Sequence, residues 1–298
     1  MHLSTAAAIV QNLMERSQPA FSGGKIPTMA RFAGWQLRSR LIEDEMVFPF
    51  VSESKLLAKR GFTSSTIEYY LGLDDPPAAA FILHYLRPGD LFADVGANIG
   101  VYSVLASSVC QARSIAFEPS SSAFAMLQRN VQINAIAGLV DTRHLAVGST
   151  PGSIRFEAAL STCNRVVTGS QQAETEEVAR VTLDDALTET PVIIKADVMG
   201  YEPFVVEGAQ RHLADPQLAA VILGTARHAP VFGLPRERAG ELLAEFGFAL
   251  ATYDARQRAL TWLEEPDYRF KSLYVRRTDA IATRLKEAPQ FTVHGRAF

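Results

Sequence analysis

The stretch LFADVGANIG, residues 91–100, decides the fold of this chain. Its first half is a short apolar run that predicts a buried strand, and the glycines that follow predict a tight turn into a helix. Such a turn is the ligand-binding element of doubly wound α/β sheets. A dinucleotide loop would have a glycine where Asn98 stands, and a carboxylate, Asp94, opens this loop instead. An acid suits a cationic ligand better than a phosphate, and a tight turn with a capping aspartate is the alternative.

Outward from this stretch, short apolar runs alternate with helical patterns. This alternation predicts an α/β fold with a mostly parallel sheet covered by helices on both faces. Three further runs near the C-terminus predict closing antiparallel strands, and hairpin-like pieces interrupt the alternation at about 148–182. The four parallel runs after the first are RSIAF (113–117), VDTRHLAV (140–147), VIIKADV (192–198) and AAVIL (219–223), and the closing ones are FALATYD, ALTWL and SLYVRR.

The chain before this sheet has a different pattern. Residues 1 to about 46 have apolar side chains at helical spacing, interrupted at FSGGKIP, and VFPFV with its central proline predicts an edge strand. Two prolines after Asp74–Asp75, which we interpret as a turn, predict the start of a helix. We therefore expect a helical and edge-strand cap over 1–89, a ligand-binding domain over 90–277 and a polar tail over 278–298.

Two further strand ends carry acidic residues. Glu118 follows the second strand, 24 positions after Asp94, close to the spacing of the acid that accepts hydrogen bonds from ribose hydroxyls. Pro119, whose φ is fixed by its ring, sets the direction in which the chain leaves that strand. Asp197 ends the fourth strand and is predicted either to face the cleft or to cap the following helix. A surface glutamate before a helix is the alternative for Glu118.

These blocks together resemble the FkbM family of methyltransferases, which depend on S-adenosyl-L-methionine (SAM). The resemblance implies a class I methyltransferase fold, Rossmann-like with seven strands, SAM as the cofactor, and O-methylation of a hydroxyl on a sugar or natural product. By position, it implies a cofactor pocket of Asp94, Gly96, Asn98 and Glu118, with Pro119 beside them, and an acceptor side with Asn164 and Asp197. The matching blocks are DVGANIGVYS (94–103), AFEPSSSAFAMLQRNVQIN (116–134), LAVG (145–148), VTLDDAL (181–187) and IIKADVMGYEPFVVEGA (193–209).

The chain departs from the family pattern at two strand ends. Met199 stands where the family has a glutamate, and Gly224 stands near the usual acid of the fifth strand, while Glu202 is retained. Losing both of two facing polar groups can be nearly neutral, so the paired change indicates an altered acceptor site built from Met199, Glu202 and Gly224. The alternative is a SAM-binding protein whose methyl transfer is lost or redirected.

An alcohol acceptor also needs a base. Asp197 is the first candidate, and His228 is the second because its ordinary pKa suits neutral pH, although a surface or packing role is the commoner one for a lone histidine. No Asp/His cluster has metal-ligand spacing, so we expect no metal. A nicotinamide oxidoreductase is a third reading, which Asn98 disfavours.

Composition limits the partners. The 298 residues are 48% hydrophobic and 20% charged with a net charge of −3, which argues against broad nucleic-acid binding. Cys110 and Cys163 form no metal or disulfide motif, and no signal peptide or membrane span is evident, so we expect a cytoplasmic protein that does not bind a membrane. The expected partner is a small-molecule or glycan acceptor. The N-terminal helices could cover that site or form a homodimer interface.

Overall fold

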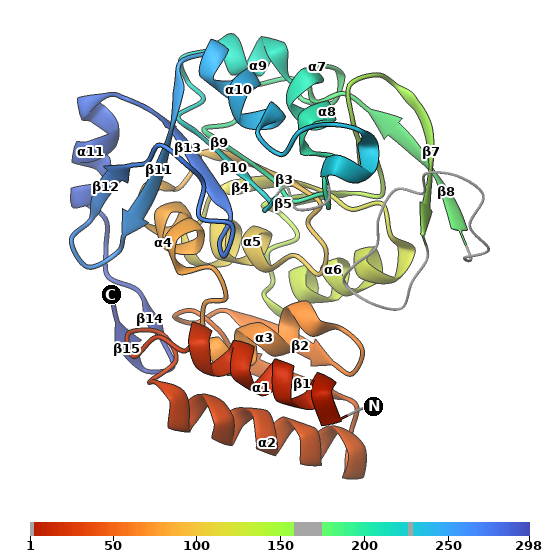
Figure 1. The fold of residues 1–298 in the computed structure, drawn as a ribbon, viewed down its shortest axis with the longest axis vertical. Helices are drawn as coiled ribbons and strands as arrows, with labels where there is room; N and C mark the ends of the chain where they lie inside the picture. The colour runs from red at the N-terminus through yellow and green to blue at the C-terminus, as the bar shows by residue number, and fades with distance from the viewer. Residues whose placement is uncertain (1–2, 158–174, 226–228) are drawn as a thin grey trace.

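The computed structural model describes residues 3–157, 175–225 and 229–298, and its centre is a sheet of eight strands (Figure 1). The five strands from β10 to β5 are parallel, whereas β13, β11 and β12 are antiparallel to their neighbours. The hairpin strand β12 extends the edge, so the sheet has one strand more than the seven expected. The order is β12 (Ala259–Trp262), β11 (Phe248–Asp254), β13 (Ser272–Arg276), β10 (Ala220–Leu223), β9 (Ile193–Ala196), β3 (Leu91–Val95), β4 (Arg113–Phe117) and β5 (Val140–Arg143).

Helices cover both faces of this sheet, as the alternating pattern predicts (Figure 1). Side chains alternate along each strand, so Phe92 packs into the core on one face while Ala93 and Val95 pack into the core on the other. The first core contains α4 (Pro76–Tyr85), α5 (Val101–Val104) with its π-helical continuation Leu105–Val109, and α6 (Ser121–Ile133). The second contains α7 (Leu183–Ala186), α8 (Glu202–Glu207), α9 (Gln210–Ala214) and α10 (Arg238–Glu245).

The N-terminal residues form a separate layer beneath α4, α5 and α6 (Figure 1). The helical stretch ends earlier than expected, because the residues after position 44 pair as strands. The second strand of that pair and the helix after it were not predicted. Their buried side chains join the same core as the sheet, and the boundary at residue 89 stays a prediction. The elements are α1 (Leu3–Arg16), α2 (Lys25–Leu41), β1 (Glu45–Pro49), β2 (Lys55–Lys59) and α3 (Thr63–Leu71).

The run 140–147, expected as one strand, is divided between two sheets. β5 ends at Arg143, and the chain turns at His144, whose ring stacks on Phe124. The next two residues form β6 (Ala146–Val147), which pairs with the predicted hairpin of β7 (Gly152–Glu157) and β8 (Thr175–Val181). This break turns the chain toward the carboxyl ends of the central strands.

The C-terminal segment returns to the N-terminal layer. It contains α11 (Asp279–Lys286), β14 (Thr292–Val293) and β15 (Arg296–Ala297), and a short 3-10 helix (Ala229–Phe232) precedes α10. No helix in the described parts of the chain is long and apolar enough to cross a bilayer.

Candidate active site

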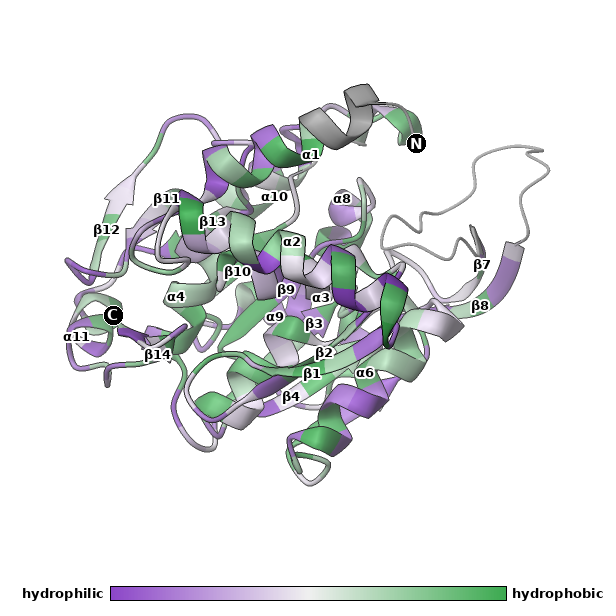
Figure 2. Ribbon diagram, turned by 90° about the horizontal axis from the view of Figure 1, so that it is seen from below, coloured by the Kyte–Doolittle hydropathy of each residue, from purple (hydrophilic) through white to green (hydrophobic). Residues whose placement is uncertain are grey.

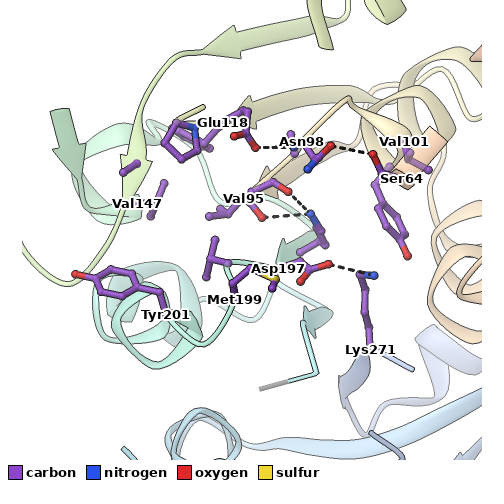
Figure 3. A pocket seen from close by; sticks show the side chains of 18 of the residues that line it. Ser64, Val95, Asn98, Val101, Glu118, Val147, Asp197, Met199, Tyr201 and Lys271 are labelled. Carbon is purple, nitrogen blue, oxygen red and sulfur yellow. Dashed lines mark hydrogen bonds and ion pairs between the residues drawn. The ribbon is translucent and has the colours of Figure 1, made fainter. Parts of the chain in front are cut away.

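A cavity opens at the carboxyl ends of β3, β4 and β9, where ligands bind in doubly wound sheets (Figure 3). Segments from both halves of the sheet line it, and α3 with the loop after it closes one side. The residues that line it include Ser64, Glu68, Gly96, Asn98, Tyr102, Glu118, Pro119, Val147, Lys195, Asp197, Met199 and Lys271.

The turn after β3 requires glycine for two reasons. Gly96 has a φ of +68°, and a Cβ there would lie 2.3 Å from the carbonyl oxygen of Asp197. Its N–H and that of Ala97 both donate to the carbonyl of Phe117, so the turn is fastened across the end of β4. The main chain at Gly96 therefore lies bare against the cavity, as predicted for a loop that approaches a ligand closely.

Glu118 lies at the cavity wall directly after β4. Its Oε2 accepts the N–H of Asn98 at 2.7 Å and its Oε1 accepts the N–H of Ser120 at 2.8 Å (Figure 3). Burial raises the pKa of this carboxyl to about 7, although both backbone hydrogen bonds oppose the shift. Each oxygen keeps a lone pair after these bonds, so an ionised Glu118 can still accept from a ligand.

Asp94 does not line the cavity, so the prediction that it contacts the cofactor directly is wrong. It shares a strand face with Phe92 and therefore points toward α5, where its Oδ2 accepts the hydroxyl of Ser103 at 2.7 Å. Its Oδ1 lies 3.0 Å from Nζ of Lys195, and both side chains are almost fully buried. The two carboxylates at the ends of β3 and β4 thus have different surroundings, and only Glu118 faces the cavity.

Lys195 connects Asp94 to the glycine turn. Its Nζ donates to the carbonyls of Gly96 at 2.7 Å and Val95 at 3.3 Å. A buried lysine in a strand is uncommon unless it is paired, and the sequence IIKA shows that signal, which our sequence analysis left unused. The Asp94–Lys195 pair therefore holds the turn by its backbone.

Asp197 lines the cavity as predicted, and the ammonium of Lys271 lies 3.1 Å from its Oδ2 (Figure 3). Burial raises the pKa of Asp197, but Lys271 and Lys195 outweigh it and hold the pKa below its usual value. Burial lowers the pKa of Lys271, but Tyr102, Asp197 and Asp75 raise it well above its usual value. Both groups are therefore charged at neutral pH.

Lys271 was missed by the sequence reasoning, because no local pattern marks the residue before β13. Its backbone N–H donates to Oδ2 of Asp75 at 2.6 Å, and its Nζ lies 5.3 Å from the ring centroid of Tyr102. Asp75 is also the N-cap of α4, as the turn at 74–75 implies. One lysine thus joins the N-cap of α4 to the end of β9.

The side of the cavity formed by α3 was also missed. The hydroxyl of Ser64 donates to Oδ1 of Asn98 at 3.0 Å (Figure 3). Glu68 is buried and accepts the N–H of Asp74 at 2.9 Å, and burial together with the charge of Asp74 raises its pKa well above the usual value. Burial therefore favours the protonated form of Glu68, which can both donate and accept hydrogen bonds.

Of the three residues expected at an altered acceptor site, only Met199 lines the cavity. It has a φ of +55°, in the left-handed region. Glu202 begins α8 and turns back to accept the N–H of Val198 at 3.0 Å, and burial followed by the charge of Asp197 raises its pKa to about 7. A Cβ on Gly224 would lie 2.6 Å from Oδ1 of Asp197 and 2.7 Å from Oε1 of Glu202. Glu202 and Gly224 thus lie beside Asp197 but do not line the cavity.

Two predicted residues, Asn164 and His228, lie outside the described residues, as does Cys163. Within the described segments, no group of three or more His, Cys, Asp or Glu side chains is arranged to hold a metal ion. Cys110 is buried, and burial raises the pKa of its thiol to about 12.

Comparison with known protein families matches residues 94–270, more than half of the chain, to the methyltransferase FkbM domain. The chain belongs to the FkbM methyltransferase family. Among solved structures, this FkbM chain is similar to methyltransferase FkbM from Methylobacillus flagellatus KT at 16% identity and a TM-score of 0.46. That match covers 91% of this chain and 59% of the other, so this FkbM chain spans less than two thirds of that relative.

A second similar structure is a SAM-dependent methyltransferase from Thiobacillus denitrificans in complex with S-adenosyl-L-homocysteine (SAH). It is 12% identical with a TM-score of 0.34, and the match covers 51% of this chain and 50% of that one. No curated protein matches the chain.

SAM is the cofactor that membership of this methyltransferase family implies. The cavity suits such a molecule, whose sulfonium and ammonium are cationic. Glu118 has lone pairs free for ribose hydroxyls, Gly96 lines the cavity without a side chain, and Asp197 supplies negative charge. Pro119 and Val147 supply apolar surface for an adenine ring. These residues would hold the cofactor.

Proposed function

We propose that this protein transfers a methyl group from SAM to a hydroxyl oxygen of a small-molecule or sugar acceptor. The observation that carries the proposal is the carboxylate of Asp197, which lines the cavity beside Gly96 and forms an ion pair with Lys271 at 3.1 Å. A charged acceptor of protons at this position is the group that an alcohol substrate needs.

Bound SAM would supply a methyl group on a sulfonium, and its transfer to the acceptor oxygen would leave SAH. The hydroxyl proton released from the acceptor would pass to Asp197. A carboxylate with a lowered pKa is sufficient, because the oxygen becomes strongly acidic once it is alkylated. Lys271 keeps Asp197 ionised and in one position, and most of the acceleration comes from holding the two reactants together.

The polar groups on the α3 side support a hydroxylated acceptor. In its protonated form Glu68 offers both a donor and an acceptor. The Ser64 hydroxyl, which donates its proton to Asn98, offers an acceptor, so the two residues together match the two-way hydrogen bonding of alcohols. Both lie on the same wall of the cavity as Tyr102, whose ring adds apolar surface. An acceptor that combines hydroxyls with apolar faces, such as a sugar, matches this lining.

The alternative is a protein that binds SAM without turnover. Met199 favours it, because a thioether occupies the wall where the family has an acid and can neither bind a proton nor orient a hydroxyl strongly. Binding and turnover must therefore be measured separately.

The test begins with titration of SAH into the protein by calorimetry, where we expect a single site. Turnover is then followed as SAH release with a panel of sugar and small-molecule alcohols. Asp197→Asn is expected still to bind SAH, which lacks the positive charge of the sulfonium, but to lose about a hundredfold in kcat. Glu264→Gln, an exposed acid, is the matched control and should change neither.

Three results separate the readings. Absence of SAH binding overturns the proposed function entirely. Binding without release of SAH across the panel supports the alternative. Full turnover by Asp197→Asn shows that another group takes the proton, and the assignment to Asp197 then fails.

A further inference from the structure

The outward face of α2 carries a continuous apolar stripe. Ile26, Leu37 and Leu41 are 85%, 63% and 73% exposed. Spacings of three or four residues place them on one side of the helix, together with small exposed residues between them. On the opposite side Trp35 is buried against the rest of the molecule. Figure 2 shows α2 lying across this outer face, and the small residues are Ala30, Ala33 and Gly34.

We propose that α2 packs antiparallel against α2 of a second copy of this chain, through this stripe. A two-fold contact pairs one surface with itself, so the stripe must be complementary to its own reverse. The midpoint between Ile26 and Leu41 falls between Ala33 and Gly34, and so does the midpoint between Ala30 and Leu37. With the two-fold axis at that point, Ile26 of one copy lies opposite Leu41 of the other, and Ala30 lies opposite Leu37.

The order of sizes along the stripe suits close contact of two helices. Leu37 of one copy lies opposite Ala30 of the other, so a large side chain meets a small one. At the axis, Ala33 lies opposite Gly34, and a Cβ added to Gly34 would meet nothing within 4 Å. Small residues at the centre allow the two backbones to approach, and Ile26 and Leu41 close the two ends.

The charges at the ends of the stripe are complementary in the same register. Lys25 is exposed at the start of α2, and Glu43 is exposed just after its end. In the antiparallel pair Lys25 lies beside Glu43 of the second copy, at both ends of the contact. In the described parts of one chain, Glu43 forms an ion pair with the half-exposed side chain of Arg38 at 3.2 Å, and a solvated pair of this kind is weak enough to exchange for a new partner.

A lipid surface is the other occupant to consider, and the stripe suits it less. Membrane-surface helices place bulky aromatic and aliphatic residues on the apolar face and basic residues on the polar one. Here Trp35 points inward, the centre of the stripe has only small side chains, and Glu43 and Asp44 come directly after Leu41 and Ile42. Anionic lipid would repel that end.

The first test is sedimentation velocity of the full chain from about 1 to about 200 µM. A helix pair about 25 Å long is smaller than a standard interface of about 800 Å² per partner, so we expect a concentration-dependent dimer. Gly34→Lys places a long charged side chain on the axis and should weaken dimerisation more than tenfold. Because lysine has a higher helix propensity than glycine, the variant should still fold. Gly138→Lys, at another exposed glycine with open space around it, should leave the dimer unchanged.

The second test reports the register. A cysteine at Ala33 lies beside the axis, so Ala33→Cys should form a disulfide-linked dimer on oxidation. Leu41→Cys alone should not, because its counterpart is Ile26, but mixed with Ile26→Cys chains it should give the mixed dimer. All three positions are exposed, so reactivity is matched.

A native chain that stays monomeric over the whole range overturns the proposal, as does a dimer that survives Gly34→Lys. Self-linking by Leu41→Cys as efficient as that of Ala33→Cys overturns the antiparallel register. Binding of a monomeric chain to vesicles of phosphatidylglycerol, lost in Gly34→Lys, would assign the stripe to a membrane instead. None of these readouts depends on methyl transfer, so failure here leaves the proposed function untouched.

Discussion

The ammonium of Lys271 lies 3.1 Å from the carboxylate of Asp197, although 74 positions of sequence separate the two residues. Asp197 ends the parallel strand β9, and Lys271 directly precedes the antiparallel strand β13. The start of β13 lies at the same edge of the sheet as the end of β9, because β13 runs antiparallel to β10, the strand between them. Reversal of one strand thus brings a cation to an edge formed by the carboxyl ends of the others.

Replacing Lys271 with Met should shift the pH dependence of activity. Without the ammonium, burial dominates and the pKa of Asp197 rises, so its ionised form is lost at a higher pH. We expect the acidic limb of the kcat profile to move upward and kcat at neutral pH to fall about tenfold. An unchanged acidic limb in Lys271→Met would show that Asp197 is not the titrating group. Lys286→Met, an exposed lysine on α11, is the control.

Glu118 should make cofactor binding depend on pH. Its pKa is about 7, and ribose hydroxyls donate to the ionised form, so affinity for SAH should rise from about pH 6 to about pH 8 and then level off. Glu118→Gln should weaken SAH binding about tenfold or more and remove the slope. Calorimetric titrations at several pH values measure both effects.

Glu202→Gln is the matched control for that experiment, because Glu202 also has a pKa of about 7 but does not line the cavity. It should keep the slope. If the SAH affinity of Glu118→Gln still depends on pH and that of Glu202→Gln does not, Glu202 and not Glu118 is the group that controls cofactor binding.

The raised pKa of Glu118 also affects stability. Between its unfolded value near 4.5 and its folded value near 7, the folded state holds more protons than the unfolded state. The free energy of unfolding contributed by this group therefore falls as pH rises through that range. In urea titrations Glu118→Gln should lose less stability than the native chain between these pH values, and an equal loss would contradict the shift.

Asp94 should act through Lys195 rather than by contact with the ligand. Asp94→Asn leaves a buried ammonium without its counter-charge and should cost about 3 kcal/mol or more in the free energy of unfolding. Asp94→Asn combined with Lys195→Met removes the charged partner as well, and we expect it to recover much of that loss. SAH affinity should stay low in the double variant, because the carbonyls of Gly96 and Val95 lose their donor. Native SAH affinity in the double variant would show that the hydrogen bonds from Lys195 to the glycine turn are unnecessary for cofactor binding.

Gly224 should be intolerant of any side chain. A Cβ would lie within 2.7 Å of both the Asp197 and the Glu202 carboxylates, and one of them would have to move. Gly224→Ala should therefore lower kcat without abolishing SAH binding, and it should cost about 1–3 kcal/mol in stability. Gly138→Ala, where a Cβ has open space, is the control. Native kcat in Gly224→Ala would show that the position of Asp197 is not critical. The same clash makes Gly224→Glu an unsuitable way to restore the family's acid.

The sequence by itself determined the strand and helix alternation, the glycine turn at 96–100 and the placing of Glu118 and Asp197 at strand ends. These features follow from local periodicity and from residue spacing along one strand–turn–helix unit. The same reasoning predicted the hairpin after residue 148 and the antiparallel closing strands, whereas β2 and α3 are too short and too mixed in polarity to show a clear period.

Only the tertiary structure decided which acid faces the cavity. Asp94 and Glu118 look equivalent in sequence, but strand pleating turns Asp94 toward α5, and its desolvated charge then needs Lys195. Likewise, Lys271 and Glu68 reach the site from segments that no local pattern connects to it. Local periodicity is a property of neighbouring residues, whereas the burial and pairing of a charge depend on which distant segments pack around it.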